Sequence, residues 1–213
     1  MFFKKFFRNV FGHALEKKIS MEGQGFRFQG KSADARTWET NEGEVVGVYF
    51  CDLPPDLPEG QTTLRALLKR HRKNLEQMGA DVVEVGYRQI QGVRSVFCIS
   101  KVSRGPQRGF IYIGSLIIPF RECSFVVKSM FEESGTTGVR EAVLLNRLMA
   151  SGEVDVDDNG AIQGGWFPDD SSYDDEFPDH PLSKLRALFS KIERALCLQP
   201  DLLDQAPFLY PSC

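Results

Sequence analysis

The sequence predicts an α+β fold in which an antiparallel β-sheet is flanked by helices. Strand-like runs rich in β-branched and aromatic residues follow one another between residues 81 and 132, separated by short polar or glycine-containing breaks. Amphipathic helical patterns lie on either side of these runs, at 61–78 and 137–150. The order β-α-β-β-β-β-α has too few β-α alternations for a doubly wound parallel sheet, so we expect helices packed on an antiparallel sheet.

Composition supports a globular protein. The 213 residues are 42% hydrophobic and 26% charged, with a formal net charge of −3, which is not the composition of a disordered chain. No run approaches eighteen consecutive apolar residues, so an integral membrane protein is not expected. The five cysteines are widely separated, without a C-x-x-C pair, and predict neither a disulfide framework nor a zinc site. With no secretory signal pattern, the predicted location is the cytoplasm, and Cys98 and Cys123 are expected to be buried thiols.

The first elements of the body are a strand and a helix. Residues 44–51 (EVVGVYFC) are rich in β-branched and aromatic side chains and end at a Pro-Pro loop, which predicts a strand. The helix at 61–78 begins at Thr62 or Thr63 as N-cap and ends at Gly79. Its apolar face is expected to carry Leu64, Leu67, Leu68, His71, Leu75 and Met78.

Four strands and a helix follow. The predicted strands are 81–90, 93–103, 109–119 and 122–132, and they form an antiparallel meander. The third strand is apolar on both faces and is therefore expected to be central. The helix at 137–150 is expected to bury Val139, Ala142, Val143 and the Leu144–Met149 stretch.

This order of elements resembles the PsbP-like fold over about residues 44–150. The resemblance rests on the helix LRALLKRHRKNLEQMG, the strand pair EVGYRQIQGVRSVFCIS with its central Gly92, the strand FIYIGSLIIPF and the helix VREAVLLNRLM. This α/β/α sandwich occurs in a photosystem II extrinsic protein, in a nuclear-import factor that binds the Ran GTPase and in chaperones for secreted effectors. The resemblance implies a protein-binding role without catalytic residues.

The N-terminal segment has the pattern of an amphipathic helix with a basic side. Its apolar stripe would be covered by the protein's own sheet or a second subunit, by an anionic membrane surface, or by the groove of a partner. A mitochondrial-type presequence has the same features. The candidate contact residues are Phe2, Phe3, Phe6, Phe7 and Phe11 with Lys4, Lys5 and Arg8.

Residues 152–180 contain ten acidic residues and no Lys or Arg, a local charge of −10. Asp155, Asp157 and Asn159 match the start of a D-x-D-x-N-G calcium loop, but Trp166 stands where a bidentate Glu should close the coordination shell. The alternatives are a hairpin turned by Asn159-Gly160, or an acidic surface for a basic partner or for the protein's own N-terminus. The candidate residues of that surface are Asp169, Asp170, Asp174 and Asp175.

A C-terminal helix is predicted from Pro181 onward, with Asp179 as its cap and the missing N–H of Pro181 in the first turn. Three arrangements would cover the apolar side of this helix: packing against the body of the protein, exchange between the subunits of a dimer, or binding to a partner. The apolar positions expected to need cover are Leu182, Leu185, Phe189, Ile192 and Leu196.

Motifs for catalysis and nucleic-acid binding are absent from the sequence. It lacks a G-x-S-x-G elbow, a P-loop, a dinucleotide-binding glycine motif and H-E-x-x-H. The histidines His13, His71 and His180 lie in three different zones, without a Cys, Asp or Glu at ligand spacing on a helix. The basic side of the helix at 61–78 lacks an RNA-binding aromatic signature, so no nucleic-acid partner is expected.

The sequence therefore divides into an amphipathic helix and linker at 1–25, an α+β core at 26–151, an acidic loop segment at 152–180 and a C-terminal helix and tail at 181–213. The predicted function is non-enzymatic, chaperone-like or adaptor-like binding of a hydrophobic helix from another protein. A homodimer is a further possibility. The alternatives are a peripheral membrane-surface protein anchored by residues 1–15 and an enzyme of unrecognised type. No cofactor is expected, apart from calcium at the incomplete loop.

Overall fold

The computed structural model describes most of the chain from residue 18 onward. The predicted N-terminal helix at 1–15, with its phenylalanine and basic side chains, lies outside the described part. The described residues are 18–21, 23, 25–31, 35–55, 57, 63–76, 79–105, 109–157, 159–205 and 208.

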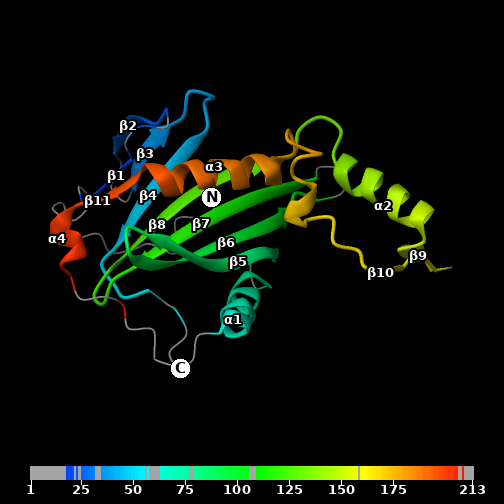
Figure 1. The fold of residues 1–213 in the computed structure, drawn as a ribbon, viewed down its shortest axis with the longest axis horizontal. Coiled ribbons are helices and arrows are strands. Elements are labelled where there is room, and N and C mark those ends of the chain that lie inside the picture. The colour runs from blue at the N-terminus through cyan, green and yellow to red at the C-terminus, as the bar shows by residue number, and fades with distance from the viewer. Residues whose placement is uncertain are drawn as a thin grey trace.

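Seven strands form one antiparallel sheet in the order β2-β3-β4-β8-β7-β6-β5 (Figure 1). The meander predicted for the last four strands is confirmed, because β5, β6, β7 and β8 pair in chain order. Strands β2 and β3 were not predicted and extend the sheet beyond β4. The bounds are β2 Arg27–Lys31, β3 Ala35–Glu39, β4 Val45–Cys51, β5 Ala80–Ile90, β6 Val93–Ser103, β7 Phe110–Pro119 and β8 Ser124–Glu132.

Strand β7 lies between β6 and β8, as its apolar character on both faces predicts. Tyr112, Leu116 and Ile118 point to one face and are fully buried, whereas Ile113 and Ile117 on the opposite face are half-buried. The first face therefore carries the main core of the protein.

Helix α3, Pro181–Ala195, covers that first face (Figure 1). Its predicted apolar positions are buried, which confirms packing against the body, and burying each such side chain contributes about 2 kcal/mol. Phe189 lies directly over Gly114 of β7, and a Cβ at position 114 would come within 2.9 Å of Phe189 Cδ2 and Cζ. A glycine is therefore required under this ring.

The start of α3 differs from the predicted start. His180 is the N-cap, and its Nδ1 accepts a hydrogen bond from the backbone N–H of Leu182 at 3.3 Å. Asp179 is instead 96% exposed and pairs with Lys184. The predicted position of Pro181 in the first turn is confirmed. A buried imidazole thus replaces the expected carboxylate as the cap, with consequences for the cluster described below.

Helix α1, Leu64–Glu76, packs beside β5 over the second face of the sheet. Leu67 is fully buried there against Val96 of β6 and Leu57, in a core cluster separate from that of α3. The helix predicted at 61–78 is therefore confirmed over the residues that the structure describes there, Leu64–Glu76.

Two short strands join segments from the two halves of the chain. Strand β1, Ile19–Met21, pairs antiparallel with β11, Leu196–Leu198, and the helix α4, Pro200–Leu203, follows. Helix α3 therefore ends at Ala195, and Leu196 is buried in β11 rather than in a helix. Ile19 and Leu198 belong to the same core cluster as the sheet and α3.

Helix α2, Val139–Ser151, buries Leu144 and Leu148 as expected, but not the other apolar residues that we expected it to bury. Val139, Val143 and Met149 are 46%, 44% and 43% exposed, because α2 extends past the end of the sheet instead of lying on it (Figure 1). The sheet face that α2 would need is occupied by α3. The helix instead contacts a hairpin formed by β9, Val154–Val156, and β10, Ile162–Gly164.

The cysteines of the described residues are free, including Cys98 and Cys123. Burial raises the pKa of the Cys98 thiol to about 12 and that of the Cys123 thiol to about 11. Both thiols are therefore protonated at neutral pH and behave as small buried apolar groups, as expected, although Cys123 directly precedes β8 rather than lying in it.

Candidate functional site

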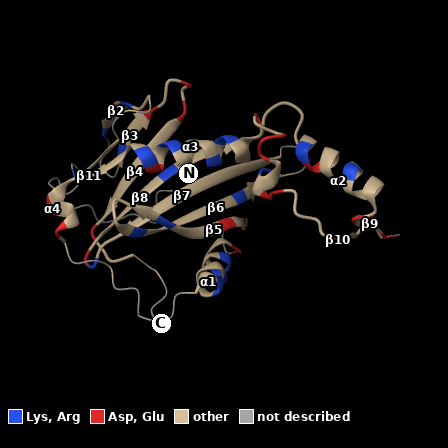
Figure 2. Ribbon diagram, viewed as in Figure 1, with Lys and Arg blue, Asp and Glu red and all other residues tan. Residues whose placement is uncertain are grey.

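The candidate contact region is the arm formed by α2 and the segment that follows it, residues 139–180. The arm projects from the end of the sheet (Figure 1). Its acidic segment meets the basic residues of α2 and α3 where the arm joins the sheet (Figure 2). We call this element the α2 arm.

Arg140 anchors the α2 arm from the inside. Its side chain is 0% exposed. The guanidinium donates hydrogen bonds to the carbonyl oxygens of Pro168 (2.8 Å) and Asp170 (2.7 Å), to Asp174 Oδ1 (3.1 Å) and to Ser183 Oγ (3.0 Å). A buried guanidinium is stable only when its donors are satisfied, so these partners fix the first turn of α2 against the acidic segment and α3.

Two further basic residues hold the same segment to the body. Arg186 of α3 donates to both oxygens of Asp174, at 2.9 and 3.1 Å, and to the carbonyl oxygen of Asp169 at 2.7 Å. It also donates to Glu84 of β5 at 3.0 Å. Lys101 of β6 pairs with the carboxylate of Asp169. The α2 arm is therefore connected to strand β6 and to α3 by charged groups.

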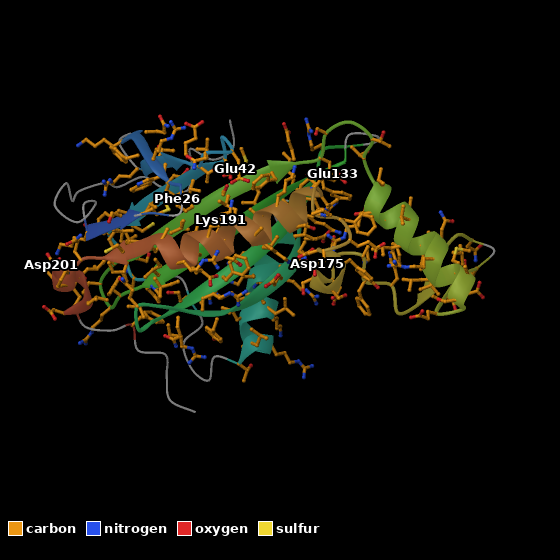
Figure 3. All side chains as sticks on the ribbon, turned by 45° about the horizontal axis from the view of Figure 1, so that its top comes forward. Phe26, Glu42, Glu133, Asp175, Lys191 and Asp201 are labelled. Carbon is orange, nitrogen blue, oxygen red and sulfur yellow. The ribbon has the colours of Figure 1, made fainter. Side chains whose placement is uncertain are left out.

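The predicted acidic surface is divided between internal and exposed positions. Asp169 and Asp174 make the internal contacts just described, whereas Asp175 is exposed (Figure 3). Asp170 is also exposed, and its carboxylate accepts the backbone N–H of Ser172 at 2.8 Å, which lowers the pKa of that carboxyl. Binding of a basic partner by this surface stays a prediction.

The predicted calcium-loop residues lie in the β9–β10 hairpin, which confirms the hairpin predicted for this segment. Asp157 Oδ1 accepts the backbone N–H groups of Asn159 and Ala161, both at 2.9 Å, and these bonds lower the pKa of the Asp157 carboxyl. Asp155 Oδ1 accepts the backbone N–H of the following residue at 2.8 Å. Calcium binding by these residues stays a prediction.

The outer side of α2 carries an exposed apolar stripe. Its large members, Val139, Val143 and Met149, are each more than 40% exposed, and the exposed Ala142, Asn146 and Ala150 lie on the same side. Single exposed apolar residues are common on protein surfaces, but a grouped set on one helix face is typical of contact surfaces. The stripe lies on the opposite side from Leu144 and Leu148, which are buried.

Sequence reasoning did not find Arg140 or the exposure of the stripe. A signal for Arg140 was present, because it precedes Leu144 and Leu148 by four and eight residues and so shares their helix face. A basic residue on an apolar helix face needs buried acceptors, and the acidic segment that follows α2 supplies them.

Comparisons with known proteins find similar structures but no family. No protein-family model matches the chain, and no curated protein sequence matches it. Cyanobacterial PsbP (CyanoP) from Synechocystis sp. PCC 6803 is similar in structure, with a TM-score of 0.42, 9% identity, and coverage of 86% of this chain and 88% of that chain. The Ran-binding protein Mog1p of Saccharomyces cerevisiae has a TM-score of 0.47, 10% identity, and coverage of 89% and 95%. Both have the PsbP-like fold that the sequence resembles; similarity at this level carries no information about function.

Proposed function

We propose that this protein binds another protein without catalysing a reaction, and that the apolar stripe of α2 is the contact surface. The observation that supports this most directly is the exposure of Val139, Val143 and Met149 on a helix that projects from the sheet. Covering such side chains on association removes apolar surface from water and contributes about 25 cal/mol per Å².

The proposed partner element is a hydrophobic helix that lies along α2. A 13-residue helix is about 20 Å long, which matches between three and four turns of a second helix packed beside it. Because Arg140 and Arg186 already fix the α2 arm, little conformational entropy is lost when the partner binds. The exposed carboxylates of Asp170 and Asp175 would favour a partner helix with basic flanks.

Photo-crosslinking tests this proposal in the full chain. A photo-reactive amino acid replaces Val143 in one variant and Leu203 in a matched control, because Leu203 is 41% exposed but lies on α4. We expect the probe at position 143 to give a crosslinked product of one defined mass. This product should be lost when Val139→Lys and Met149→Lys are added, and the probe at position 203 should give no product.

The adduct also identifies the class of partner. An adduct of twice the mass of the chain means that the stripe joins two copies, and light scattering should then show a dimer that the two lysine substitutions dissociate. An adduct of any other mass identifies a different protein. Equal labelling at positions 143 and 203 would contradict the proposal.

The membrane-surface alternative concerns residues 1–15, which lie outside the described part of the chain. None of the helices that the structure describes is long and apolar enough to cross a membrane. Co-sedimentation with anionic vesicles, comparing the full chain with a chain that starts at Ser20, tests this alternative. Equal pelleting of the two chains would contradict an anchor at residues 1–15.

A further inference from the structure

Three potential metal ligands from separate segments converge where the α2 arm joins the sheet. Glu133 directly follows β8, Glu141 lies in the first turn of α2, and His180 is the N-cap of α3. One ligand atom from each side chain lies within 4.8 Å of one ligand atom from each of the others. Figure 3 labels Glu133 at this end of the sheet.

Glu133 is held in place by backbone groups. Its side chain is 5% exposed. Oε2 accepts the N–H of Phe110 at 2.9 Å, and Oε1 accepts the N–H of Gly138 at 3.3 Å. Gly109 packs so closely against this carboxylate that a Cβ there would overlap it. The position of the carboxylate is therefore set by the fold before any ligand binds.

The other two side chains present buried polar atoms without a hydrogen-bond partner among the described residues. These atoms are both carboxylate oxygens of Glu141 and Nε2 of His180. The His180 side chain is only 9% exposed, and its Nε2 points toward Glu133 Oε1 at 3.6 Å. The fully buried hydroxyl of Tyr112 also lacks a hydrogen-bond partner among the described residues. The centroid of the Tyr112 ring lies 5.4 Å from that of the His180 ring. Buried polar atoms normally have hydrogen-bond partners, which a bound ion or an ordered water would supply here.

No Lys or Arg of the described residues forms an ion pair with Glu133 or Glu141. The basic side chains that act on the cluster already contact other carboxylates, since Lys101 pairs with Asp169 and Arg140 with Asp174. A divalent cation between the carboxylates of Glu133 and Glu141 would give the Glu141 oxygens the partner that they lack.

We propose that Glu133, Glu141 and His180 bind one divalent transition-metal ion. An imidazole nitrogen with two carboxylates suits Zn²⁺ or Mn²⁺, whereas Ca²⁺ and Mg²⁺ favour ligand sets made only of oxygen. The site is separate from the apolar stripe of α2 and from the β9–β10 hairpin, so it stands independently of the proposed partner binding.

Metal binding requires one change of tautomer. Nδ1 of His180 now accepts the N–H of Leu182 across 3.3 Å, which places the imidazole hydrogen on Nε2. When a metal ion binds Nε2 of the neutral imidazole, the hydrogen lies on Nδ1 instead. Nδ1 can then no longer accept the N–H of Leu182, so this cap hydrogen bond is lost. Metal binding and capping of α3 therefore compete for the same imidazole.

Equilibrium dialysis of the full chain against Zn²⁺ and, separately, Mn²⁺ tests the site. Mn²⁺ is included because it binds thiols weakly, so that the cysteines do not contribute. We expect one equivalent of metal, and a Kd weakened at least about tenfold by Glu141→Gln and by His180→Asn. Asparagine is a good N-cap, so His180→Asn keeps the start of α3 while removing the imidazole.

The control is the double variant Asp155→Asn/Asp157→Asn, which removes the carboxylates of the hairpin and should leave the Kd unchanged. Circular dichroism establishes that each variant is folded, and EDTA should lower the melting temperature of the metal-loaded wild type but not that of Glu141→Gln. If the wild type binds no Mn²⁺ or Zn²⁺, or if only the hairpin variant loses binding, the proposal is wrong and the cluster holds protons or water.

Discussion

The guanidinium of Arg140 lies 3.1 Å from the carboxylate of Asp174, although 34 residues separate them in the chain and the arginine side chain is completely buried. Arg186 contacts the same carboxylate oxygen at 2.9 Å. Asp174 therefore joins a helix beyond the sheet to a helix on the sheet. Buried ion pairs of this kind contribute less to net stability than to the choice of one arrangement.

Replacing Arg140 with methionine should destabilise the protein by about 3–5 kcal/mol, because it leaves buried acceptors on the acidic segment without a donor. Urea unfolding measures the loss. Hydrogen exchange should show increased amide exchange at 165–180. The matched control is Arg147→Met on the same helix, whose pair with Glu176 is exposed and should change stability little. Equal losses from the two substitutions would contradict the anchoring role of Arg140.

Replacing Gly114 with alanine should destabilise the protein by about 1–3 kcal/mol, because the added methyl group overlaps the ring of Phe189. Adding Phe189→Leu should recover part of that loss, so the two substitutions should be non-additive in a double-mutant cycle. Gly165→Ala is the control, since a Cβ there meets no atom within 4 Å.

Glu141→Gln should stabilise the metal-free protein at pH 7. The pKa of Glu141 is raised above its ordinary value of 4.5, so above pH 4.5 the unfolded chain releases this proton more readily than the folded protein does. The wild type thus loses stability as the pH rises from 4.5 through the folded pKa. Urea unfolding in EDTA should show a larger free energy of unfolding for the glutamine variant than for the wild type at pH 7. This difference should vanish near pH 4.5. A wild type that is more stable at pH 7 would contradict this.

His180 should have the opposite pH dependence. Burial, followed by the charge of Arg140, lowers the pKa of His180 below its ordinary 6.5, although Glu133 and Asp169 act to raise it. As the pH falls, the unfolded chain therefore binds a proton at His180 before the folded protein does. The free energy of unfolding then decreases as the pH drops from 6.5 toward the folded pKa. Relative to His180→Asn, the wild type should lose stability between pH 7.5 and 5.5 in EDTA. A constant difference would mean that His180 does not titrate differently on unfolding.

Asp157→Ala should loosen the β9–β10 hairpin without unfolding the protein. The carboxylate accepts two backbone N–H groups of the turn, from Asn159 and Ala161, and both lose their acceptor. Hydrogen exchange resolved by residue should show faster exchange at these two amides. Asp155→Ala is the comparison, because the only hydrogen bond of the Asp155 carboxylate among the described residues is to the adjacent backbone N–H, so the turn amides should be unchanged.

The central strands could be predicted from sequence because their patterns agree with their environment. β5 to β8 are long and rich in β-branched residues, and the buried positions of α3 recur at helical spacing. Strand β2 was missed because its side chains are mostly exposed and polar, so no alternation marks it. Strands β1 and β11 have three residues each, too few to show a period.

The positions of α2 and of the metal cluster could not be predicted for a different reason. The pattern of α2 contains apolar residues on two sides, and only competition with α3 for the sheet decides which side is buried. Glu133, Glu141 and His180 come from three separate segments, with the histidine 39 positions after the second glutamate. No local spacing rule detects ligands brought together by the fold in this way.

The order of elements along the chain matters during synthesis. Strands β5 to β8 leave the ribosome before α3. Strand β1 pairs with β11, although most of the chain lies between the two strands. The nascent polypeptide therefore holds a long apolar strand surface that α3 has not yet covered, the state in which growing chains aggregate or are bound by chaperones. Completion of this fold is a late event that depends on the arrival of residues 181–198.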